Sequence, residues 1–337
     1  MSYKLSLLDQ SPIFNQESPE IALKRTVELA QKAEQLGYHR FLVSEHHNSQ
    51  DVAGSSPEIL VTYLLAKTEK IRIGSGGVML QHYSPYKVAE NFHVLANLAG
   101  DRVDLGIGKA PGGLPLSTKA LQYKRNAIEN DFYERLNLLN QFVNNSIPED
   151  HKFAGLQATP LPLAKPNIIL LGASRESAAD AAKLGITFSY AQFFNSNDDE
   201  LEAAVNVYYE HFPTGKFILG VNVIASTDEQ KAKALAKNQE IYKVHLNSGK
   251  RLTLATEEQA EKFGKESGES YKIEKHIPNV IYGTPAQIKQ KLDELHSKYG
   301  IDEFIYHTPV KDHQARLQSI ELLSPSNLHK LEESIIL

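Results

Sequence analysis

Cysteine and tryptophan are both absent from this chain of 337 residues, and methionine occurs only twice. Without cysteine the protein has no disulfide, no thiolate nucleophile and no cysteine-ligated metal. Long apolar runs are missing as well, because no stretch approaches the roughly 18 residues that a transmembrane helix needs. The N-terminus lacks a charged segment followed by an apolar one, so we expect no signal peptide and a cytoplasmic protein.

An excess of basic charge is also lacking. The chain carries 36 Lys and Arg against 41 Asp and Glu, a net charge of −5. Proteins that bind nucleic acid need a basic footprint, so nucleic acid is not an expected partner, and neither is a membrane. Hydrophobic residues make up 41% of the chain, which is enough for a sizeable core. These balances favour an enzyme that acts on a small molecule.

Short runs rich in Val, Ile, Leu, Phe and Tyr recur along the chain, as is typical of buried parallel strands. Helical patterns separate them, and three begin with a serine cap and a first-turn proline, at Ser18-Pro19, Ser56-Pro57 and Ser84-Pro85. Capping boxes are predicted at Thr227 with Gln230 and at Thr284 with Gln287. Eight strand–helix repeats favour a (β/α)₈ TIM barrel, with an open doubly wound sheet as the alternative. The eight predicted strands are Lys4–Leu8, Arg40–Ser44, Ile71–Met79, Val103–Ile107, Asn167–Leu171, Thr187–Gln192, Phe217–Ala225 and Glu303–His307.

Two segments interrupt the repeat within a single predicted domain of residues 1–337. Residues 110–166 follow the fourth strand and contain one helical pattern, at about 125–144. Residues 248–278 follow the seventh strand and are rich in Lys, Glu, Ser and Gly. Long insertions in compact domains are often lids or binding loops. A disordered surface loop is the alternative for the second segment.

Glycines cluster at the end of the third strand, in Gly74-Ser75-Gly76-Gly77. In a (β/α)₈ barrel the active site lies at the carboxyl ends of the strands. One interpretation is the close approach of a flat ligand, and the alternative is a bulge or corner of the barrel. Gly106-x-Gly108 resembles a dinucleotide fingerprint only weakly, because Pro111 interrupts it and no helix opens directly after it.

The helix that begins after Ser174 offers an anion-binding site. Free N–H groups and a partial positive charge at a helix N-terminus suit a phosphate. Ser174 can add a hydroxyl, and Lys109 or Arg175 can add a positive charge. The alternative is that Ser174 only caps the helix and Arg175 is a solvated side chain.

Two histidines, His46 and His47, follow Glu45 at the end of the second strand. Neighbouring residues on a strand point to opposite sides, so at most one of them faces the barrel mouth. That histidine could act as a general acid or base near neutral pH. A purely structural pair is one alternative. A metal site is another, but no other strand end is rich in histidine, and we predict no metal.

Taken together, these strand ends resemble the bacterial-luciferase-like flavin monooxygenases, over nearly the whole chain. The resemblance implies a (β/α)₈ barrel, often dimeric, that binds FMN at the mouth. It further implies reduced FMN supplied by a separate flavin reductase, and O₂ used to oxygenate a small organic substrate. Six blocks carry the resemblance in the expected order: 7–12 (LLDQSP), 44–47 (SEHH), 55–58 (SSPE), 71–80 (IRIGSGGVML), 82–85 (HYSP) and 102–113 (RVDLGIGKAPGG).

The family pattern also implies roles for individual residues. His46 corresponds to the catalytic histidine, and a non-proline cis peptide is expected within Ser75–Gly77. Lys109 stands where the family usually has arginine, so it keeps the charge but not the bidentate fork. Gly108 replaces the cysteine of luciferase, so light emission is not implied. The residues expected to contact the flavin are Asp9, Ser75, Gly76, Gly77, Lys109, Ala110, Gly172, Ser174, Arg175, Glu176 and Ser177.

An FMN-dependent monooxygenase is therefore the leading hypothesis. Three alternatives remain: a relative that transfers hydride with the deazaflavin F420, a flavin-binding protein without turnover, and a barrel enzyme without flavin. No motif in the sequence identifies the substrate.

Overall fold

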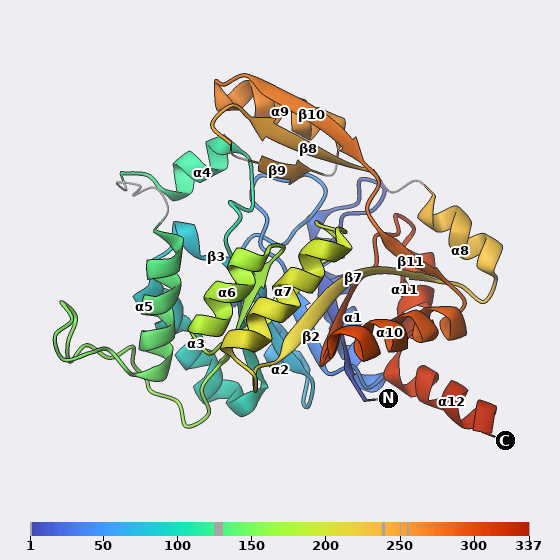
Figure 1. Ribbon diagram of the computed structural model, residues 1–337, viewed down its shortest axis with the longest axis horizontal. Coiled ribbons are helices and arrows are strands. Elements are labelled where there is room, and N and C mark those ends of the chain that lie inside the picture. The colour runs from blue at the N-terminus through green and yellow to red at the C-terminus, as the bar shows by residue number, and fades with distance from the viewer. Residues whose placement is uncertain (1, 125–130, 238–239, 250, 255, 337) are drawn as a thin grey trace.

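Eight parallel strands close into a ring in the computed structural model, which describes residues 2–124, 131–237, 240–249, 251–254 and 256–336 (Figure 1). The order around the ring is β1-β2-β3-β4-β5-β6-β7-β12, and β12 pairs back onto β1. The predicted (β/α)₈ barrel is confirmed. The ring strands are β1 (Lys4–Asp9), β2 (Arg40–Val43), β3 (Arg72–Met79), β4 (Val103–Gly108), β5 (Asn167–Gly172), β6 (Thr187–Ala191), β7 (Phe217–Ala225) and β12 (Glu303–His307).

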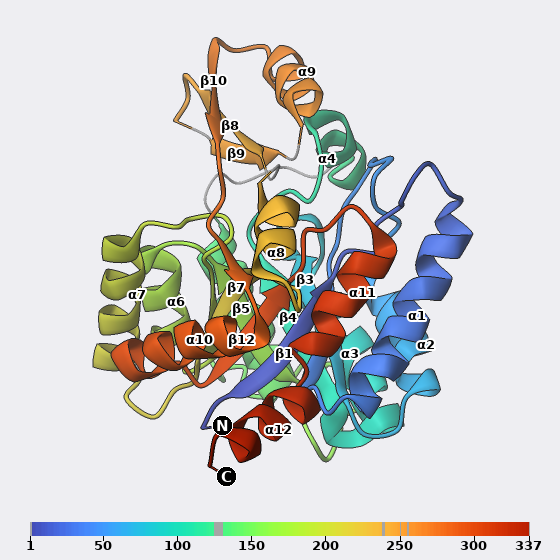
Figure 2. The ribbon, with the colours of Figure 1, turned by 90° about the vertical axis from the view of Figure 1, so that its right-hand side faces the viewer.

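Helices surround the ring and bury their apolar faces against its outer surface (Figure 2). The Ser18, Ser56 and Ser84 starts are confirmed, each with proline at the first helical turn. The helices are α1 (Pro19–Gln35), α2 (Pro57–Lys67), α3 (Pro85–Ala99), α4 (Pro115–Leu121), α5 (Phe132–Asn144), α6 (Arg175–Lys183), α7 (Asp198–His211), α8 (Glu229–Ala236), α9 (Glu257–Ser267), α10 (Pro285–Tyr299), α11 (His313–Leu322) and α12 (Pro325–Ile336), with 3₁₀ turns η1 (Leu80–His82) and η2 (Gly100–Arg102).

One of the two predicted capping boxes is wrong. At α10 the box is present: Thr284 accepts from the Gln287 amide, and the Gln287 side chain accepts from the Thr284 amide. At α8 the cap is Asp228 instead of Thr227. The Asp228 carboxylate accepts from the Gln230 amide at 2.7 Å and the Lys231 amide at 3.2 Å. A carboxylate that satisfies two amides is the better cap, so the helix begins one residue later than predicted.

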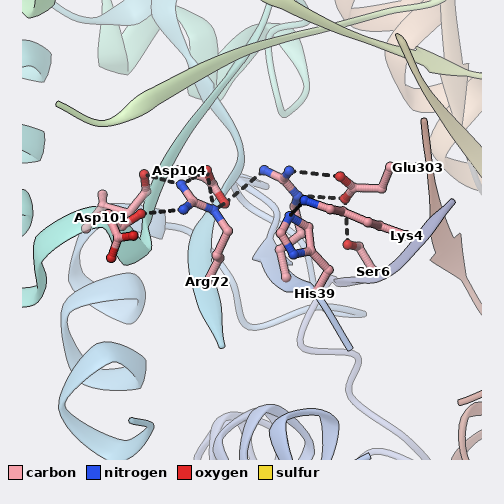
Figure 3. Close-up of polar contacts among 9 residues, drawn as sticks. Lys4, Ser6, His39, Arg72, Asp101, Asp104 and Glu303 are labelled. Atoms are coloured by element: carbon pink, nitrogen blue, oxygen red, sulfur yellow. Dashed lines mark hydrogen bonds and ion pairs between the residues drawn. The ribbon is translucent and has the colours of Figure 1, made fainter. Parts of the chain in front are cut away.

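Five polar side chains close the lower end of the ring and form the barrel floor: Ser6, Arg40, Arg72, Asp104 and Glu303 (Figure 3). Arg40 donates to both oxygens of Glu303, at 2.6 and 2.8 Å, and lies 2.9 Å from Asp104. Burial alone lowers the pKa of Arg40, but Asp104 and Glu303 raise it above its usual value. The floor therefore holds a buried charge network that connects β1, β2, β3, β4 and β12.

The first insertion adds two helices at the side of the barrel. Its predicted helix is α5, which starts at Phe132, and the earlier part of the prediction, 125–130, lies outside the described residues. The sequence pattern did not indicate α4, a short helix that begins after Leu114. The return segment passes through a cis Thr159-Pro160 bond before it enters β5.

The second insertion has regular structure, and it starts before residue 248. A three-stranded antiparallel sheet of β10 (Tyr271–His276), β8 (Ile241–Leu246) and β9 (Arg251–Leu254) packs with α9. We call these residues, 241–276, the cap. They stand above the carboxyl ends of the ring strands (Figures 1 and 2). A disordered loop is therefore not what the structure has at this place.

The cap rests on the first insertion and on the loop after β2. Leu114, just before α4, joins an apolar cluster with Val244 and Phe263 of the cap. The side-chain amide of Gln259 donates from Nε2 to the Asp51 carboxylate at 2.9 Å. The chain returns from the cap through β11 (Val280–Gly283), which extends the sheet by pairing with the upper half of β7. The cap and the beginning of the first insertion, up to α4, thus form one cover over one end of the barrel.

The barrel floor makes a prediction about stability. Replacing Glu303 with leucine leaves Arg40 buried with one fewer carboxylate, which typically costs about 3–5 kcal/mol. Urea unfolding should show a loss of this size for Glu303→Leu. The matched control is Glu321→Leu, because Glu321 pairs with Lys32 at 2.9 Å while both side chains are about 40% exposed. Exposed pairs contribute at most about 1 kcal/mol, and equal losses in the two variants would contradict the assigned role of the floor.

Candidate active site

The lumen of the barrel is layered. Residues two apart on a strand share a face, and the lumen-facing positions above the floor are apolar. Leu8, Leu42, Ile169, Ile218 and Ile305 pack together there as a separate cluster from the outer core. This cluster seals the ring over the charged floor, so the polar groups at the carboxyl ends of the strands form the mouth, which lies beneath the cap.

His46 stands at this mouth. Ser44 and His46 continue the lumen-facing series of Leu42, and the Ser44 hydroxyl lies 3.0 Å from His46 Nδ1. The His46 amide donates to the Gly54 carbonyl at 2.8 Å, which holds the backbone in place. Burial lowers the pKa of His46, the neighbouring His47 lowers it further, and Glu45 opposes both effects. A neutral imidazole at this place can accept a proton.

His47 points away into a separate network. Its Nε2 lies 2.7 Å from Glu45 Oε1, and the Tyr83 hydroxyl donates to the same oxygen at 2.7 Å. The other Glu45 oxygen accepts from the Met79 amide at 3.0 Å. His82 packs edge-to-face on the His47 ring. The structure therefore separates the two histidines as strand alternation predicts, with His46 toward the lumen and His47 in a structural role.

The glycines of β3 serve packing. The expected non-proline cis peptide lies between Gly76 and Gly77. A Cβ on Gly76 would lie 2.8 Å from the Leu8 side chain, and one on Gly77 would lie 2.7 Å from the backbone of Gly106. Ser75 is buried and donates its hydroxyl to the Gly106 carbonyl at 2.8 Å. The pairing of β3 with β4 shifts here, as a bulge does, and the flavin contact of Ser75, Gly76 and Gly77 stays a prediction.

The predicted phosphate residues come together between β4, β5 and α6. Lys109 and Ala110 follow β4 and are exposed. Lys109 lies close enough to α6 to contribute to the lowered pKa of Glu176, after the Glu176 amide, the Ser174 hydroxyl and Arg175. Gly172 lets the first turn of α6 approach β5, because a Cβ there would lie 2.6 Å from Ser177 Cβ.

The amides at the start of α6 have partners within the protein. Ser174 caps the helix and accepts from the Ser177 amide at 3.3 Å. The Arg175 amide donates to Glu200 at 2.9 Å, and the Glu176 carboxylate bonds its own amide. A phosphate at this place must displace these carboxylates. The Glu176 side chain is 75% exposed and free to turn into solvent, so the hydroxyls of Ser174 and Ser177 with Lys109 remain a fitting set for one phosphate.

Asp9 does not lie in this group. Leu8 faces the lumen, so the next residue, Asp9, points its carboxylate outward, toward the helices. There it accepts from Arg316 at 2.7 Å, from Thr26 at 2.6 Å and from the Ser11 amide at 3.1 Å. It lines a cavity of about 180 Å³ between α1 and α11. The structure therefore gives Asp9 a role in fastening helices to β1 in place of the flavin contact that we expected.

Three residues at the mouth were missed by the sequence analysis. His307 ends β12 and lies between Asn222 of β7, at 2.8 Å, and Gln10 after β1, at 3.2 Å. Phe193 packs its ring 5.8 Å from the His307 ring. The three polar residues lie on the lumen side in the carboxyl-terminal parts of β7 and β12 or directly after β1, which was a usable signal. They are not close in sequence, and no local motif connects them.

Neither a membrane span nor a metal cluster is found in the part of the chain that the structure describes. No described helix is long and apolar enough to cross a membrane. Within the same residues, no group of three or more His, Asp or Glu side chains is arranged to hold a metal ion.

Comparison with known proteins gives consistent matches. A family model described as luciferase-like monooxygenase matches residues 4–302. The N-acetyl-S-alkylcysteine monooxygenase of Bacillus subtilis is 44% identical over 96% of this chain and 98% of its own. The crystal structure of apo-MsnO8 superimposes with a TM-score of 0.76 at 29% identity, covering 96% of this chain and 98% of that one. The oxygenating constituent of 3,6-diketocamphane monooxygenase from Pseudomonas putida, in complex with FMN, has a TM-score of 0.69 at 16% identity, covering 97% and 98%.

Proposed function

The chain belongs to the luciferase-like monooxygenase family, and from this premise we propose an FMN-dependent monooxygenase that oxygenates a small thioether of the N-acetyl-S-alkylcysteine type. The observation that carries the proposal is the 44% identity, over nearly the full length of both chains, to the Bacillus subtilis enzyme of that name. The histidine at the mouth and the cover above it support the same reaction class. Reduced FMN would come from a separate flavin reductase.

The choice of FMN rests on the site between β4 and α6. One lysine and the hydroxyls of Ser174 and Ser177 suit a single phosphate monoester, whereas a pyrophosphate needs more donors. Ala110, Gly172, Arg175 and Glu176 border the same place. A structural relative of 16% identity was solved with FMN, which is compatible with this choice.

The protein's own part in the reaction follows from the mouth. Bound reduced FMN would supply two electrons to O₂, so that one oxygen enters the substrate and the other leaves as water. His46, neutral because burial lowers its pKa, takes up or returns the proton at Nε2, while Ser44 holds Nδ1. The cap and α4 exclude bulk water, which protects reactive species in such sites. His47 keeps Glu45 and Tyr83 in place behind them.

A homodimer is the proposed assembly. Neighbouring helices α2 and α3 expose large apolar side chains: Ile59 is 70% exposed, Tyr63 53%, Val94 44% and Leu98 73%. Large apolar side chains exposed on neighbouring helices often mark an interface. The isologous contact of two copies would bury them.

The first functional prediction concerns Lys109. Loss of a charge-assisted hydrogen bond costs about 1.5–3 kcal/mol, so Lys109→Ala should weaken FMN binding about tenfold or more. Riboflavin, which lacks the phosphate, should bind both proteins equally in fluorescence titrations. Lys183→Ala, at the far end of α6, is the matched control and should bind FMN normally. Equal weakening for riboflavin, or a preference for FAD or F420 in the unchanged protein, would remove this assignment.

The second functional prediction concerns His46 and includes the test of the proposed function. With reductase-supplied FMN and ¹⁸O₂, the unchanged protein should place one labelled oxygen in an N-acetyl-S-alkylcysteine. General acid–base catalysis contributes about 10²–10⁴-fold, so His46→Ala should lower product formation by that factor and leave FMN binding intact. The lowered pKa of His46 keeps its imidazole unprotonated. Activity should therefore persist at pH values below the usual pKa of histidine and fall only in more acidic buffer.

His47→Ala is the matched control for His46. It removes a bond to the buried Glu45 carboxylate, so it should reduce stability by about 1.5–3 kcal/mol with a smaller effect on rate. Near-normal product formation by His46→Ala would show that His46 is a packing residue.

The third prediction tests the dimer by light scattering. The unchanged protein should have the mass of two chains, and the double change Ile59→Glu with Leu98→Glu should give monomers, because it places charge in the apolar interface. Ile277→Glu is the control and should remain dimeric, because Ile277 is 70% exposed and lies just before β11, which pairs with β7 on the side of the ring opposite to β3. A monomeric unchanged protein would refute the assembly.

A further inference from the structure

The side chains of Gln10, Asn222 and His307 form a row of contacts across three adjacent strands. β7, β12 and β1 are neighbours in the ring. The three residues continue the lumen-facing series of Ile218, Ile305 and Leu8, so their side chains lie above the apolar layer. His307 Nδ1 is 2.8 Å from Asn222 Oδ1, and His307 Nε2 is 3.2 Å from Gln10 Oε1.

His307 is neutral at physiological pH. Its pKa is lowered to about 4, mainly by burial and in addition by the positive charge of Arg316 on α11 and by His46 in the loop after β2. Asp9 acts in the opposite direction, but its carboxylate is engaged by Arg316 at 2.7 Å. The Phe193 ring covers another side. A neutral imidazole has one N–H donor and one nitrogen acceptor.

The direction of each hydrogen bond in this row of contacts can be assigned. The Asn222 amide nitrogen donates to the Asn279 carbonyl at 3.4 Å, so Asn222 Oδ1 faces His307 and accepts from Nδ1–H. His307 Nε2 then carries no proton and can only accept. The two ends of a glutamine amide have the same shape, and hydrogen bonding decides which is which. Nε2 and Gln10 Oε1 would then be two acceptors facing each other. The Gln10 amide must therefore turn over to bring its NH₂ group to His307, which leaves its carbonyl oxygen for a ligand.

We propose that Gln10 is a specificity-determining residue whose carbonyl oxygen, oriented by His307 and Asn222, accepts a hydrogen bond from an N–H group of the substrate. The identity of that group as the amide of an N-acylated substrate rests on the proposed function. Gln10 follows β1, and the predicted phosphate residues follow β4 and β5 on the opposite side of the ring. We therefore assign the N–H group to the substrate, and the flavin ring is the other source that the test must separate.

The hydrogen-bond directions are tested first, without substrate. In histidine-¹⁵N-labelled protein, His307 should be the neutral Nδ1–H tautomer from about pH 6 to 8. Gln10→Glu offers no donor to Nε2, so His307 should then become protonated near neutral pH. An Nε2–H tautomer in the unchanged protein, or no change of His307 in Gln10→Glu, would overturn the orientation of Gln10.

The substrate contact is tested with a pair of compounds that differ by one group. The first is an N-acetyl-S-alkylcysteine and the second is its ester, in which oxygen replaces the amide N–H. Calorimetry on the FMN-loaded protein should show a preference of about tenfold or more for the amide. Gln10→Leu should bring the ratio near one, whereas Gln10→Glu, which still has an acceptor, should retain the preference. Gln31→Leu on the outer face of α1 is the control and should leave the ratio unchanged.

Each remaining outcome has a defined meaning. An unchanged ratio in Gln10→Leu would overturn the proposal even if the enzyme turns the amide over. Weaker FMN binding by Gln10→Leu with an unchanged ratio would assign the carbonyl to the flavin and overturn the substrate contact. A Gln10-dependent preference in binding without oxygenation would uphold the proposal and refute the monooxygenase reaction on this substrate. No binding of either compound would overturn both.

Discussion

Closure of eight parallel strands into a ring imposes one constraint on every residue of the barrel. Because side chains alternate, each strand position faces either the helices or the lumen. A closed ring has no free edge, so no strand can shift its pairing by one residue and exchange the two faces. We call this assignment of positions to faces the phase of the strand. The phase places Asp9 against Arg316 and Thr26 and its neighbour Gln10 in the mouth. It also sends His46 and His47 to different surroundings. The chemistry available at the mouth follows from this alternation.

The layers of the lumen explain why the chemistry is confined to one end. Arg40, Asp104 and Glu303 put charge at the floor, where ion pairs compensate the cost of burying each group. The apolar layer of Leu8, Leu42, Ile169, Ile218 and Ile305 separates that charge from the mouth. Above this layer, polar groups stand at the mouth beneath the cap. Floor and mouth are thus both polar, but the floor's groups are matched to each other and the mouth's groups have capacity left for a ligand.

The cover over the mouth is made by parts that are distant in the chain. Leu114 of the first insertion packs with Val244 and Phe263 of the cap. The segment that leads out of the cap supplies the Asn279 carbonyl, which orients Asn222 and through it His307. The position of the cap and the orientation of hydrogen-bonding groups in the mouth are therefore physically connected. A luciferase-like monooxygenase needs both, since it must hold a substrate and keep water out.

Several features of this protein were determined by the sequence alone. Apolar runs bounded by turn residues predicted all eight ring strands, because local alternation and β-propensity act over a few residues. Proline after a serine cap predicted the starts of α1, α2 and α3 for the same local reason. The Glu45-His46-His47 motif limited the lumen-facing histidine to one of two, and the family pattern indicated which.

Tertiary structure decided the features that depend on contacts between distant residues. Asp9 faces outward, and residues 10, 222 and 307 meet in the mouth, because the closed ring fixes which face each strand position takes. A short stretch of sequence does not contain this information. The bond from the Arg175 amide to Glu200 depends on where α7 packs, and the short strands of the cap pair only when the whole insertion folds back. In each case the deciding energy comes from burial and hydrogen bonds between residues far apart in the chain.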